Sequence, residues 1–269
     1  MITLRAVGIG VCASGMPGWP EAHAILRGDA PWVASALPKL DIPLLPVAER
    51  RRINPASRLA ITAAMEAMAG VAQNQLPGVV SVFATADGDG QVLANTMRTL
   101  AEDAAAMSPT LFHNSVFNAA AGYWTIACGS RAASITVSAG KGSFAAGLLE
   151  AAVQSTIDVR PVLYLAVDMP FPESLASFEV GGEPFACALL LVPGEDASST
   201  SAGSLRVGVA SGDGDWTMNG VPAAVASAFR ANPAAAALPL LRALARGEPG
   251  GMRLPYLDGC RVDVHYDPC

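Results

Sequence analysis

Hydrophobic and polar residues follow two distinct patterns along this chain. Continuous apolar runs rich in β-branched residues predict buried strands, at 2–11, 78–87, 133–139, 161–168 and 185–193. Apolar residues that recur every three or four positions predict helices, at 55–71, 91–105, 112–129 and 144–152. Continuous apolar strands that alternate with helices are typical of a parallel sheet covered on both faces. The pattern therefore predicts an α/β fold.

Turn-forming and polar residues organise the rest of the chain. Residues 12–50 are predicted to be mostly loop, because prolines and a glycine follow the first strand and disfavour a helix there. The stretch 194–204, GEDASSTSAGS, is typical of a linker. After it, the pattern predicts a strand at 205–210, helices at 221–230 and 234–246, and a final strand at 260–266. We therefore expect a main unit over 1–193 and a smaller segment over 205–269.

Composition narrows the functional classes. Apolar residues make up 52% of the 269 residues and charged residues only 15%, with a mean hydropathy of +0.38. A surface so poor in charge is typical of a chain that covers a large face with a partner, so we expect an oligomer. The net charge is -6, and Lys39 and Lys141 are the only lysines. The chain thus lacks the basic stripe of a nucleic-acid-binding protein, and no nucleic-acid partner is expected.

Cysteine usage and the N-terminus indicate a cellular compartment. The five cysteines are scattered, odd in number and without CxxC spacing, which is typical of a reducing compartment. The N-terminal stretch MITLRAVGIGV lacks the basic and apolar regions of a signal peptide. No segment reaches the roughly 20 apolar residues that a membrane-spanning helix needs. We expect a cytoplasmic protein without a membrane span.

Several short motifs lack an essential part of the site that they suggest. GIGVCA at 8–13 fits a dinucleotide-binding pattern, but prolines follow where a helix must begin. AGKGS at 139–143 lacks the Ser or Thr that follows lysine in a phosphate-binding loop. The histidines at 23, 113 and 265 are far apart and show no metal-ligand spacing. Neither a cofactor nor a metal ion is therefore expected.

The stretch 137–152, VSAGKGSFAAGLLEAA, predicts a buried strand that turns sharply at glycine and enters a helix. Proteins often hold a nucleophile at such a turn, where N–H groups of the helix N-terminus stabilise negative charge. With the segments around it, this stretch resembles the N-terminal half of the β-ketoacyl synthases, members of the thiolase-like superfamily. Seven segments carry the resemblance in the same order: VGIGV, RLAITAAMEAM, VVSVFATADG, HNSVFNAAAGYWTIA, ITVSAGKGSFAAGLLEA, VLYLAVD and PFACALLLV.

Active members of this family carry a cysteine in the turn, and alignment through ITVSA puts Gly140 at that position. They also use two histidines from the C-terminal half, where this chain has only His265, outside any HGT-like context. The resemblance therefore implies a subunit without catalytic residues, which does not elongate acyl chains alone. It also implies a thiolase-like layered fold, with a mixed sheet and helices on both faces. The N-terminal half, 1–193, would be largely complete, and 205–269 would be a strongly abbreviated C-terminal half packed on the same core.

Degenerate synthases of this kind resemble chain-length factors, above all the short type of aryl polyene (xanthomonadin-like) biosynthesis. The resemblance implies a heterodimer with an active β-ketoacyl-ACP synthase, to which acyl carrier protein delivers its cargo, so that this chain meets the carrier indirectly. The strand 133–139 would pair with its counterpart across the two-fold axis, and the helix 112–126 would face the partner's acyl tunnel. Candidate tunnel and interface residues are Phe112, Phe117, Tyr123, Trp124 and Ser138. For each aromatic residue the alternative is an ordinary core position.

Two other functions stay open on the sequence. Ser138 or Ser143 could serve as an acyl acceptor in an acyltransferase or thioester hydrolase, although the chain lacks GxSxG and an identifiable base. A stand-alone acyl-binding homodimer is the second alternative. Mass analysis after incubation with acyl thioesters tests the first, and native mass with and without a synthase partner tests the second.

Overall fold

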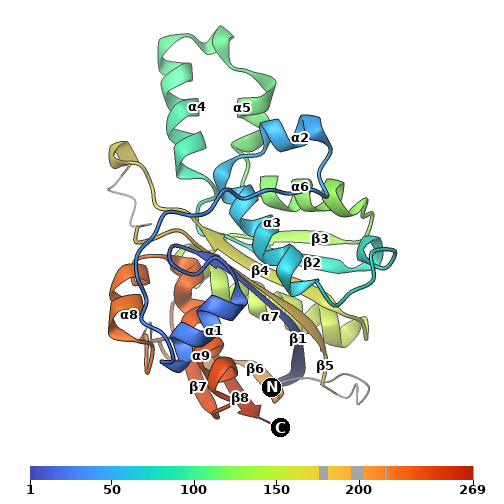
Figure 1. Cartoon of the computed structure of the whole chain (residues 1–269), viewed down its shortest axis with the longest axis vertical. Helices are drawn as coiled ribbons and strands as arrows, with labels where there is room; N and C mark the ends of the chain where they lie inside the picture. The colour runs from blue at the N-terminus through green and yellow to red at the C-terminus, as the bar shows by residue number, and fades with distance from the viewer. Residues whose placement is uncertain (176–180, 195–202, 216, 269) are drawn as a thin grey trace.

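The computed structural model describes residues 1–175, 181–194, 203–215 and 217–268. This part of the chain forms one eight-stranded sheet with the order β3-β2-β4-β5-β1-β6-β8-β7 (Figure 1). The strands are β1 (Ile2–Ala13), β2 (Val80–Ala84), β3 (Ser134–Val137), β4 (Val162–Asp168), β5 (Phe185–Pro193), β6 (Gly203–Ser211), β7 (Gly250–Leu257) and β8 (Cys260–Pro268). β2 pairs with β3 and β4 in parallel, whereas every other neighbouring pair is antiparallel. The α/β class and the mixed sheet implied by the resemblance are confirmed. The sheet is not the wholly parallel one that the strand pattern alone indicated.

Helices cover both faces of the sheet. The helices are α1 (Trp19–Arg27), α2 (Val47–Arg52), α3 (Pro55–Ala67), α4 (Gly90–Glu102), α5 (Pro109–Asn114), α6 (Ala119–Cys128), α7 (Ser143–Ile157), α8 (Ala223–Phe229) and α9 (Leu238–Arg246). Short 3-10 turns lie at Leu76–Gly78, Ala104–Ala106, Gly140–Gly142, Glu173–Leu175 and Pro233–Ala237. Residues of α3 and α6 pack against one face, and residues of α1, α7, α8 and α9 against the other. Among the described residues, no helix has the length and apolar character to cross a bilayer.

Alternation along the central strand β4 explains the two cores. Successive strand residues point to opposite faces, so Val162 and Tyr164 join the α7 side while Leu163 and Leu165 join the α3 side. All seven residues of β4 are buried. A continuous apolar run is thus the sequence that a strand with helices on both faces requires.

Two glycines of β1 explain the dinucleotide-like motif at 8–13. A Cβ atom on Gly8 would collide with the carbonyl oxygen of Ala67, and one on Gly10 with that of Ala63. Both carbonyls belong to α3, so these glycines let the helix backbone lie directly on the strand. The motif therefore serves helix packing, which agrees with its rejection as a nucleotide site.

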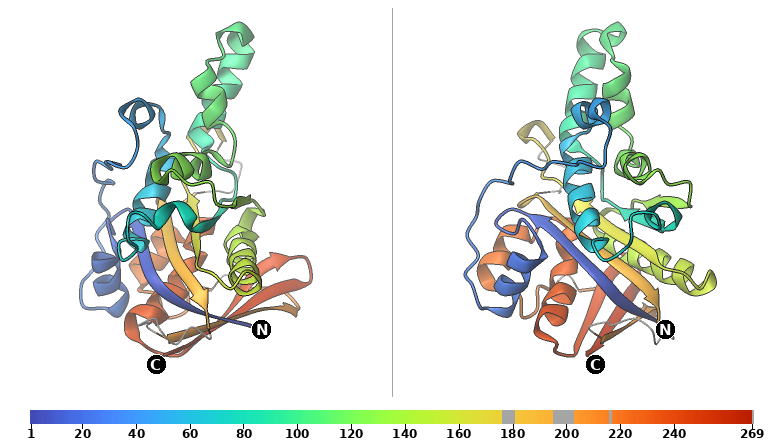
Figure 2. Two further views of the ribbon diagram at one scale, coloured as in Figure 1. Left: turned by 90° about the vertical axis from the view of Figure 1, so that its right-hand side faces the viewer. Right: turned by 45° about the vertical axis from the view of Figure 1, so that its right-hand side comes forward.

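One part of the chain projects from the layered body. Helices α4 and α5 and the segment between them form an arm that extends away from the sheet, as Figures 1 and 2 show from three directions. Asp89 caps α4 by accepting hydrogen bonds from the N–H groups of Gln91 and Val92, and Ser108 caps α5 through Leu111. Both caps fix where the helices of the arm begin.

The predicted loop at 12–50 was wrong in two places, because it contains α1 and α2. Helix α1 begins in spite of its proline, since Pro20 occupies the first turn, where an N–H group has no helical partner. It ends at the C-cap residue Gly28, which adopts a left-handed conformation with φ 88°. The prolines therefore set the start of α1 rather than preventing it.

The predicted helix 112–129 was also wrong in its extent, because residues 115–118 separate α5 from α6. The Ser115 hydroxyl donates a hydrogen bond to the Phe112 carbonyl oxygen at 2.8 Å, which competes with continuation of the helix. Strand β7 was missed because Gly250, Gly251 and Pro255 lower its β-propensity; an edge strand tolerates them.

The C-terminal segment continues the same sheet. β6 pairs with β1 from Ile2↔Val207 to Arg5↔Ser204, and β8 and β7 follow outward. Residues 195–202, most of the predicted linker, lie outside the described residues. The boundaries 1–193, 194–204 and 205–269 stay a prediction about domain organisation.

Candidate functional site

The predicted strand, turn and helix around Gly140 are present, but the expectation of a buried strand was wrong: β3 lies at the edge of the sheet, and Ser134 and Ile135 are exposed. β3 ends at Val137, a 3-10 turn spans Gly140–Gly142, and α7 begins at Ser143. Gly140 has φ 52°, in the left-handed region that favours glycine. A Cβ atom added there would meet no heavy atom within 4 Å. The position thus has space for a side chain, although the backbone conformation favours its absence.

The two serines beside Gly140 have different roles. Ser143 is 1% exposed, and its hydroxyl accepts a hydrogen bond from the Ala139 N–H at 2.9 Å and donates one to the Gly140 carbonyl at 2.8 Å. It closes the turn and does not face solvent. Ser138 is exposed and donates a hydrogen bond to the Ala86 carbonyl oxygen at 2.5 Å. Only Ser138 therefore lies where a ligand could reach it.

A shallow concavity of about 540 Å³ opens beside the turn. Its lining comes from three segments far apart in the sequence: Ala86 and Asp87 after β2, residues 115–118 between α5 and α6, and Ser138 after β3. Two of the predicted site residues, Phe117 and Ser138, thus lie at one surface. Phe117 is 52% exposed and lies in the break between the two helices.

The other three predicted aromatic residues are separated from this surface or from one another. Tyr123 and Trp124 are 0% and 1% exposed and belong to the core between α6 and α3. The Tyr123 hydroxyl donates a hydrogen bond to Asn114 Oδ1 at 3.0 Å, and burial raises the pKa of this phenol. Phe112, on α5, is 64% exposed. Phe112 and Phe117 are therefore accessible to a partner, whereas Tyr123 and Trp124 are core residues.

Asp87 carries the one carboxylate in the described lining of this concavity. None of the three histidines is among the described residues that line it. His113 lies on α5 with its ring edge-on to Tyr123, at 5.4 Å between ring centroids, and His23 contacts Trp19 in the same way. The described residues also contain no cluster of three metal-ligating side chains. The described lining thus offers serines and a carboxylate without a histidine.

Sequence reasoning missed a buried carboxyl group next to this site. Asp168 at the end of β4 is 1% exposed, and its Oδ1 accepts hydrogen bonds from Thr85 Oγ1 at 2.9 Å and the Ala86 N–H at 2.8 Å. Burial raises its pKa to about 7. The available signal was a single acidic residue at the end of an otherwise apolar strand.

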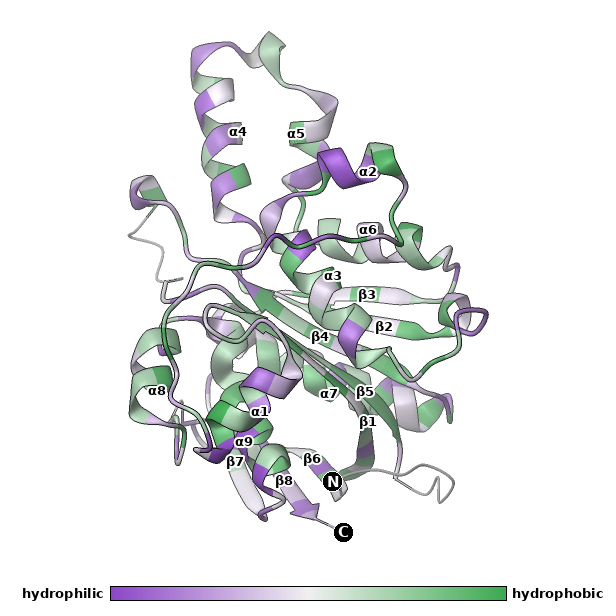
Figure 3. Cartoon of the chain, viewed as in Figure 1, coloured by the Kyte–Doolittle hydropathy of each residue, from purple (hydrophilic) through white to green (hydrophobic). Residues whose placement is uncertain are grey.

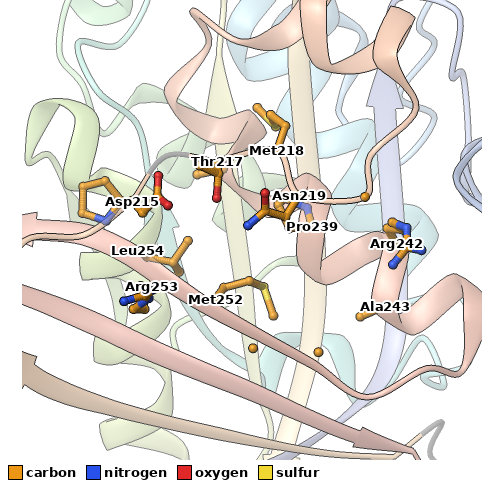
Figure 4. Close-up of a pocket in the computed structure, with 15 residues that line it drawn as sticks. Asp215, Thr217, Met218, Asn219, Pro239, Arg242, Ala243, Met252, Arg253 and Leu254 are labelled. Atoms are coloured by element: carbon orange, nitrogen blue, oxygen red, sulfur yellow. The ribbon is translucent and has the colours of Figure 1, made fainter.

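A second cavity, of about 340 Å³, lies between α9, β7, Asp215 and residues 217–220 (Figure 4). Its described lining holds Asp215, Asn219 and Arg253 but neither cysteine nor histidine. Arg242, also in the lining, is 3.4 Å from Glu248. Charges of both signs line this cavity, from Asp215, Arg242 and Arg253.

Comparisons with known proteins give the family and the fold. Residues 22–238 match the sequence profile of the β-ketoacyl synthase N-terminal domain. No curated protein matches the chain. Among solved structures, the chain is similar to one in the ketosynthase ApeO complex with its chain length factor ApeC from Xenorhabdus doucetiae, at 23% identity and a TM-score of 0.70, over 98% of this chain and 99% of that one.

Two further structures have the same fold at lower identity. The ishigamide ketosynthase/chain length factor has a TM-score of 0.75 at 14% identity, over 99% of both chains. A complex of a type II polyketide ketosynthase with its acyl-carrier protein, AntDE:AntF, has a TM-score of 0.74 at 12% identity, over 100% of this chain and 99% of that one. The expected thiolase-like ketosynthase fold is thus confirmed over the length of the chain. Because the profile covers most of its residues, the chain belongs to the family of the β-ketoacyl synthase N-terminal domain.

Proposed function

We propose that this chain is a catalytically inactive, chain-length-factor-like subunit that pairs with an active β-ketoacyl-ACP synthase and shapes its acyl tunnel. The observation that carries the proposal is Gly140, a glycine at the family's nucleophile position in an otherwise intact strand, turn and helix. A hydrogen atom cannot attack a thioester, and the described lining of the adjoining concavity offers no histidine. Under this proposal, the strand, turn and helix around Gly140 serve the assembly of the complex and not catalysis.

The edge strand β3 supports a partner on this side of the molecule. It pairs only with β2 among the described strands, and its outer edge leaves backbone groups available for a further strand. Ile135 is 37% exposed on this strand. A second, intact synthase-type subunit would present a matching strand, so pairing across the two-fold axis would cover this edge.

The projecting arm supplies an apolar surface for the same partner. Leu93, Met97 and Leu100 are 37%, 53% and 53% exposed and follow one another on one face of α4. Phe112 on α5 and Val116 just after this helix add exposed apolar area. Figure 3 shows apolar positions on α4 and α5, although both helices project from the body. An apolar face of this kind is typical of a protein interface, and the active synthase is the proposed occupant.

The concavity beside Ser138 is the proposed end of the acyl tunnel. Phe117 stands at its wall, so the volume of its ring would limit how far an acyl chain from the partner extends. The growing chain stays attached to the partner's cysteine or to carrier protein, and this chain meets the carrier only through the partner. The products belong to aryl polyene, polyketide or fatty-acid-like biosynthesis under this proposal.

Coexpression with a ketosynthase that retains its cysteine and two histidines tests the proposal. A 1:1 complex by native mass, with product lengths that depend on this subunit, is the expected result. A free, monodisperse monomer in the presence of the synthase contradicts it. A stable homodimer that ignores the synthase would instead favour the stand-alone acyl-binding protein.

One observation favours a second candidate, an acyl-transferring or hydrolytic enzyme. Ser138 is exposed and lines the concavity, which suits an acyl acceptor. Its hydroxyl hydrogen points to the Ala86 carbonyl oxygen, however, and a carbonyl oxygen is no general base. Incubation with acyl thioesters and intact-mass analysis decides this point: an adduct lost in Ser138→Ala would establish the enzyme.

A further inference from the structure

Asp168 lies behind the wall of the concavity rather than in it. It ends β4, and residues 85–88 follow β2, its parallel neighbour. The carboxyl ends of parallel neighbours meet at one edge of a sheet, which brings Asp168 and Thr85 together although 83 positions separate them. The carboxylate oxygen Oδ1 accepts hydrogen bonds from the Thr85 hydroxyl and the Ala86 N–H. Two adjacent residues of the 85–88 turn are therefore held by one atom.

Thr85 also holds the other end of this turn, at Gly88. The Gly88 N–H donates a hydrogen bond to Thr85 Oγ1 at 3.1 Å, while Thr85 donates its own hydroxyl hydrogen to Asp168. Gly88 has φ 72°, a conformation that closes the turn and favours glycine. Asp168, Thr85 and Gly88 thus form a continuous hydrogen-bonded chain across the turn.

The outer side of the turn contacts both exposed site residues. The Ala86 carbonyl oxygen accepts the Ser138 hydroxyl, and a Cβ atom on Gly88 would lie 3.4 Å from Phe117 Cα. Ala86, Ser138 and Phe117 all line the concavity. A shift of the 85–88 turn would therefore move the wall of the concavity.

Burial of the Asp168 carboxyl group costs free energy that a purely structural position does not require. It is 1% exposed, and beyond the bonds from Thr85 and Ala86 only the Ala234 backbone N–H favours its charged form; among the described residues, the one charged side chain that acts on it, Asp87, is also acidic. Burying a carboxyl group without a cationic partner costs free energy. The group is nevertheless placed where its other oxygen fastens the wall of the site.

We propose that Asp168 is a positioning residue for the acyl pocket: through Thr85 and Ala86 it fixes the turn against which Ser138 and Phe117 rest. Asn232 extends this arrangement into the C-terminal segment, since its Nδ2 donates to the Asp168 carbonyl oxygen at 2.9 Å and to that of Glu183. The effect on acyl length rests on the proposed function; the effect on the turn does not.

Hydrogen exchange tests the turn directly. Asp168→Ala leaves the Ala86 N–H and the Thr85 hydroxyl without their acceptor, so the Ala86 and Gly88 amides should exchange about tenfold faster or more. Asp168→Asn keeps an acceptor oxygen in place and should restore protection close to wild type. The control, Val264→Ala, removes buried volume from β8 on the other side of the molecule and should leave these two amides unchanged. Equal exchange in Asp168→Ala and wild type overturns the proposal.

Thr85→Val provides a second variant that keeps the carboxyl group. It removes the acceptor for the Gly88 N–H, so Gly88 should lose protection while Ala86, bonded directly to Asp168, keeps most of its own. In the complex with an active synthase, Asp168→Ala should alter product lengths at unchanged complex affinity, and Asp168→Asn should not. If wild type forms no such complex, the proposed function fails, whereas the exchange rates still decide the role of Asp168. Altered exchange with unaltered products in a working complex overturns the link to the pocket.

Discussion

The hydroxyl of Ser143 donates a hydrogen bond to the carbonyl oxygen of Gly140, 2.8 Å away, and accepts one from the N–H of Ala139. This single side chain closes the turn that is proposed to correspond to the cysteine-bearing turn of the family's active members. The turn is therefore maintained by its own hydrogen bonds and not by a side chain at position 140. If Gly140 stands at the nucleophile position, as proposed, the shape around that position is retained without the nucleophile.

Restoring a cysteine tests this independence. Gly140→Cys meets no steric obstacle, but φ 52° should make it less stable by about 1–2 kcal/mol, as measured by urea unfolding. The new thiol lies at the N-terminus of α7 and should be alkylated faster than an unperturbed thiol. Buried Cys12, Cys128 and Cys187 should stay unlabelled, because burial raises the pKa of each to about 12.

Peptide mapping after alkylation identifies the labelled thiol. Gly140→Ala is the matched control: it should lose the same stability and gain no label. Condensation activity should stay absent from Gly140→Cys, since no described histidine lines the adjoining concavity. Failure of the introduced thiol to react would show that the turn no longer exposes this position.

The neighbouring glycine should tolerate substitution far less well. A Cβ atom on Gly142 would lie 2.6 Å from the Tyr256 carbonyl oxygen, so Gly142→Ala forces β7 away from the turn. We expect a loss of about 1–3 kcal/mol in the free energy of unfolding. Gly122→Ala in α6 is the control, because its Cβ meets nothing within 4 Å and alanine favours a helix by about 0.5–1 kcal/mol. Similar stabilities for the two variants would contradict the contact with β7.

Asp168 should make stability depend on pH. Burial raises its pKa from 3.8 to about 7, so the folded chain keeps a proton that the unfolded chain has released. Between these two values the folded state binds more protons, and its stability therefore falls as pH rises, by on the order of a few kcal/mol. The amide in Asp168→Asn does not titrate, so the stability of this variant should not show this fall with rising pH.

Urea unfolding from pH 4 to pH 8 measures the effect as the difference between wild type and Asp168→Asn. The difference should grow in favour of the variant as pH rises from about 4 to about 7, and level off above that. Asp158→Asn, at an exposed carboxylate paired with Arg160, is the control and should follow the wild-type profile closely. A wild-type minus Asp168→Asn difference that is independent of pH would contradict the raised pKa.

The proposed interface is tested at β3. Ile135→Asp places a charge on the edge that would pair with the synthase, and it should weaken the complex at least tenfold, since a buried unpaired charge is costly. Ile157→Asp, at the exposed end of α7, offers the same substitution at 74% exposure and should leave binding unchanged. Equal binding by both variants would place the partner elsewhere.

The sequence was informative where local pattern and fold agree. The apolar strand, the glycine turn and the small residues of α7 could be predicted around Gly140, because each feature lies within a short stretch. The partnership of Thr85 with Asp168 could not, because it depends on β2 and β4 being parallel neighbours. A lone acidic residue at a strand end acquires meaning only when the strand order is known.

The aromatic residues show the same limit within one segment. Phe117 and Tyr123 are similar in size and only six positions apart, yet one is 52% exposed and the other fully buried. The break at 115–118 and the packing of α6 on α3 decide this, and α6 is apolar on most of its surface, so periodicity does not distinguish its buried face. Residue type alone therefore could not separate pocket wall from core.

Phe117 and Tyr123 consequently give the sharpest test of the tunnel. Phe117→Trp enlarges a side chain at the concavity and should shorten the acyl products of the synthase complex, while Phe117→Ala should lengthen them. Tyr123→Phe removes the hydrogen bond to Asn114 inside the core, so it should cost about 1 kcal/mol of stability and leave product length unchanged. Mass spectrometry of the released acyl chains distinguishes the two outcomes. The tunnel assignment is refuted if product lengths stay unchanged in both Phe117 variants and in Phe112→Trp. A change of product length in Tyr123→Phe alone would instead place the tunnel floor in the α6 core.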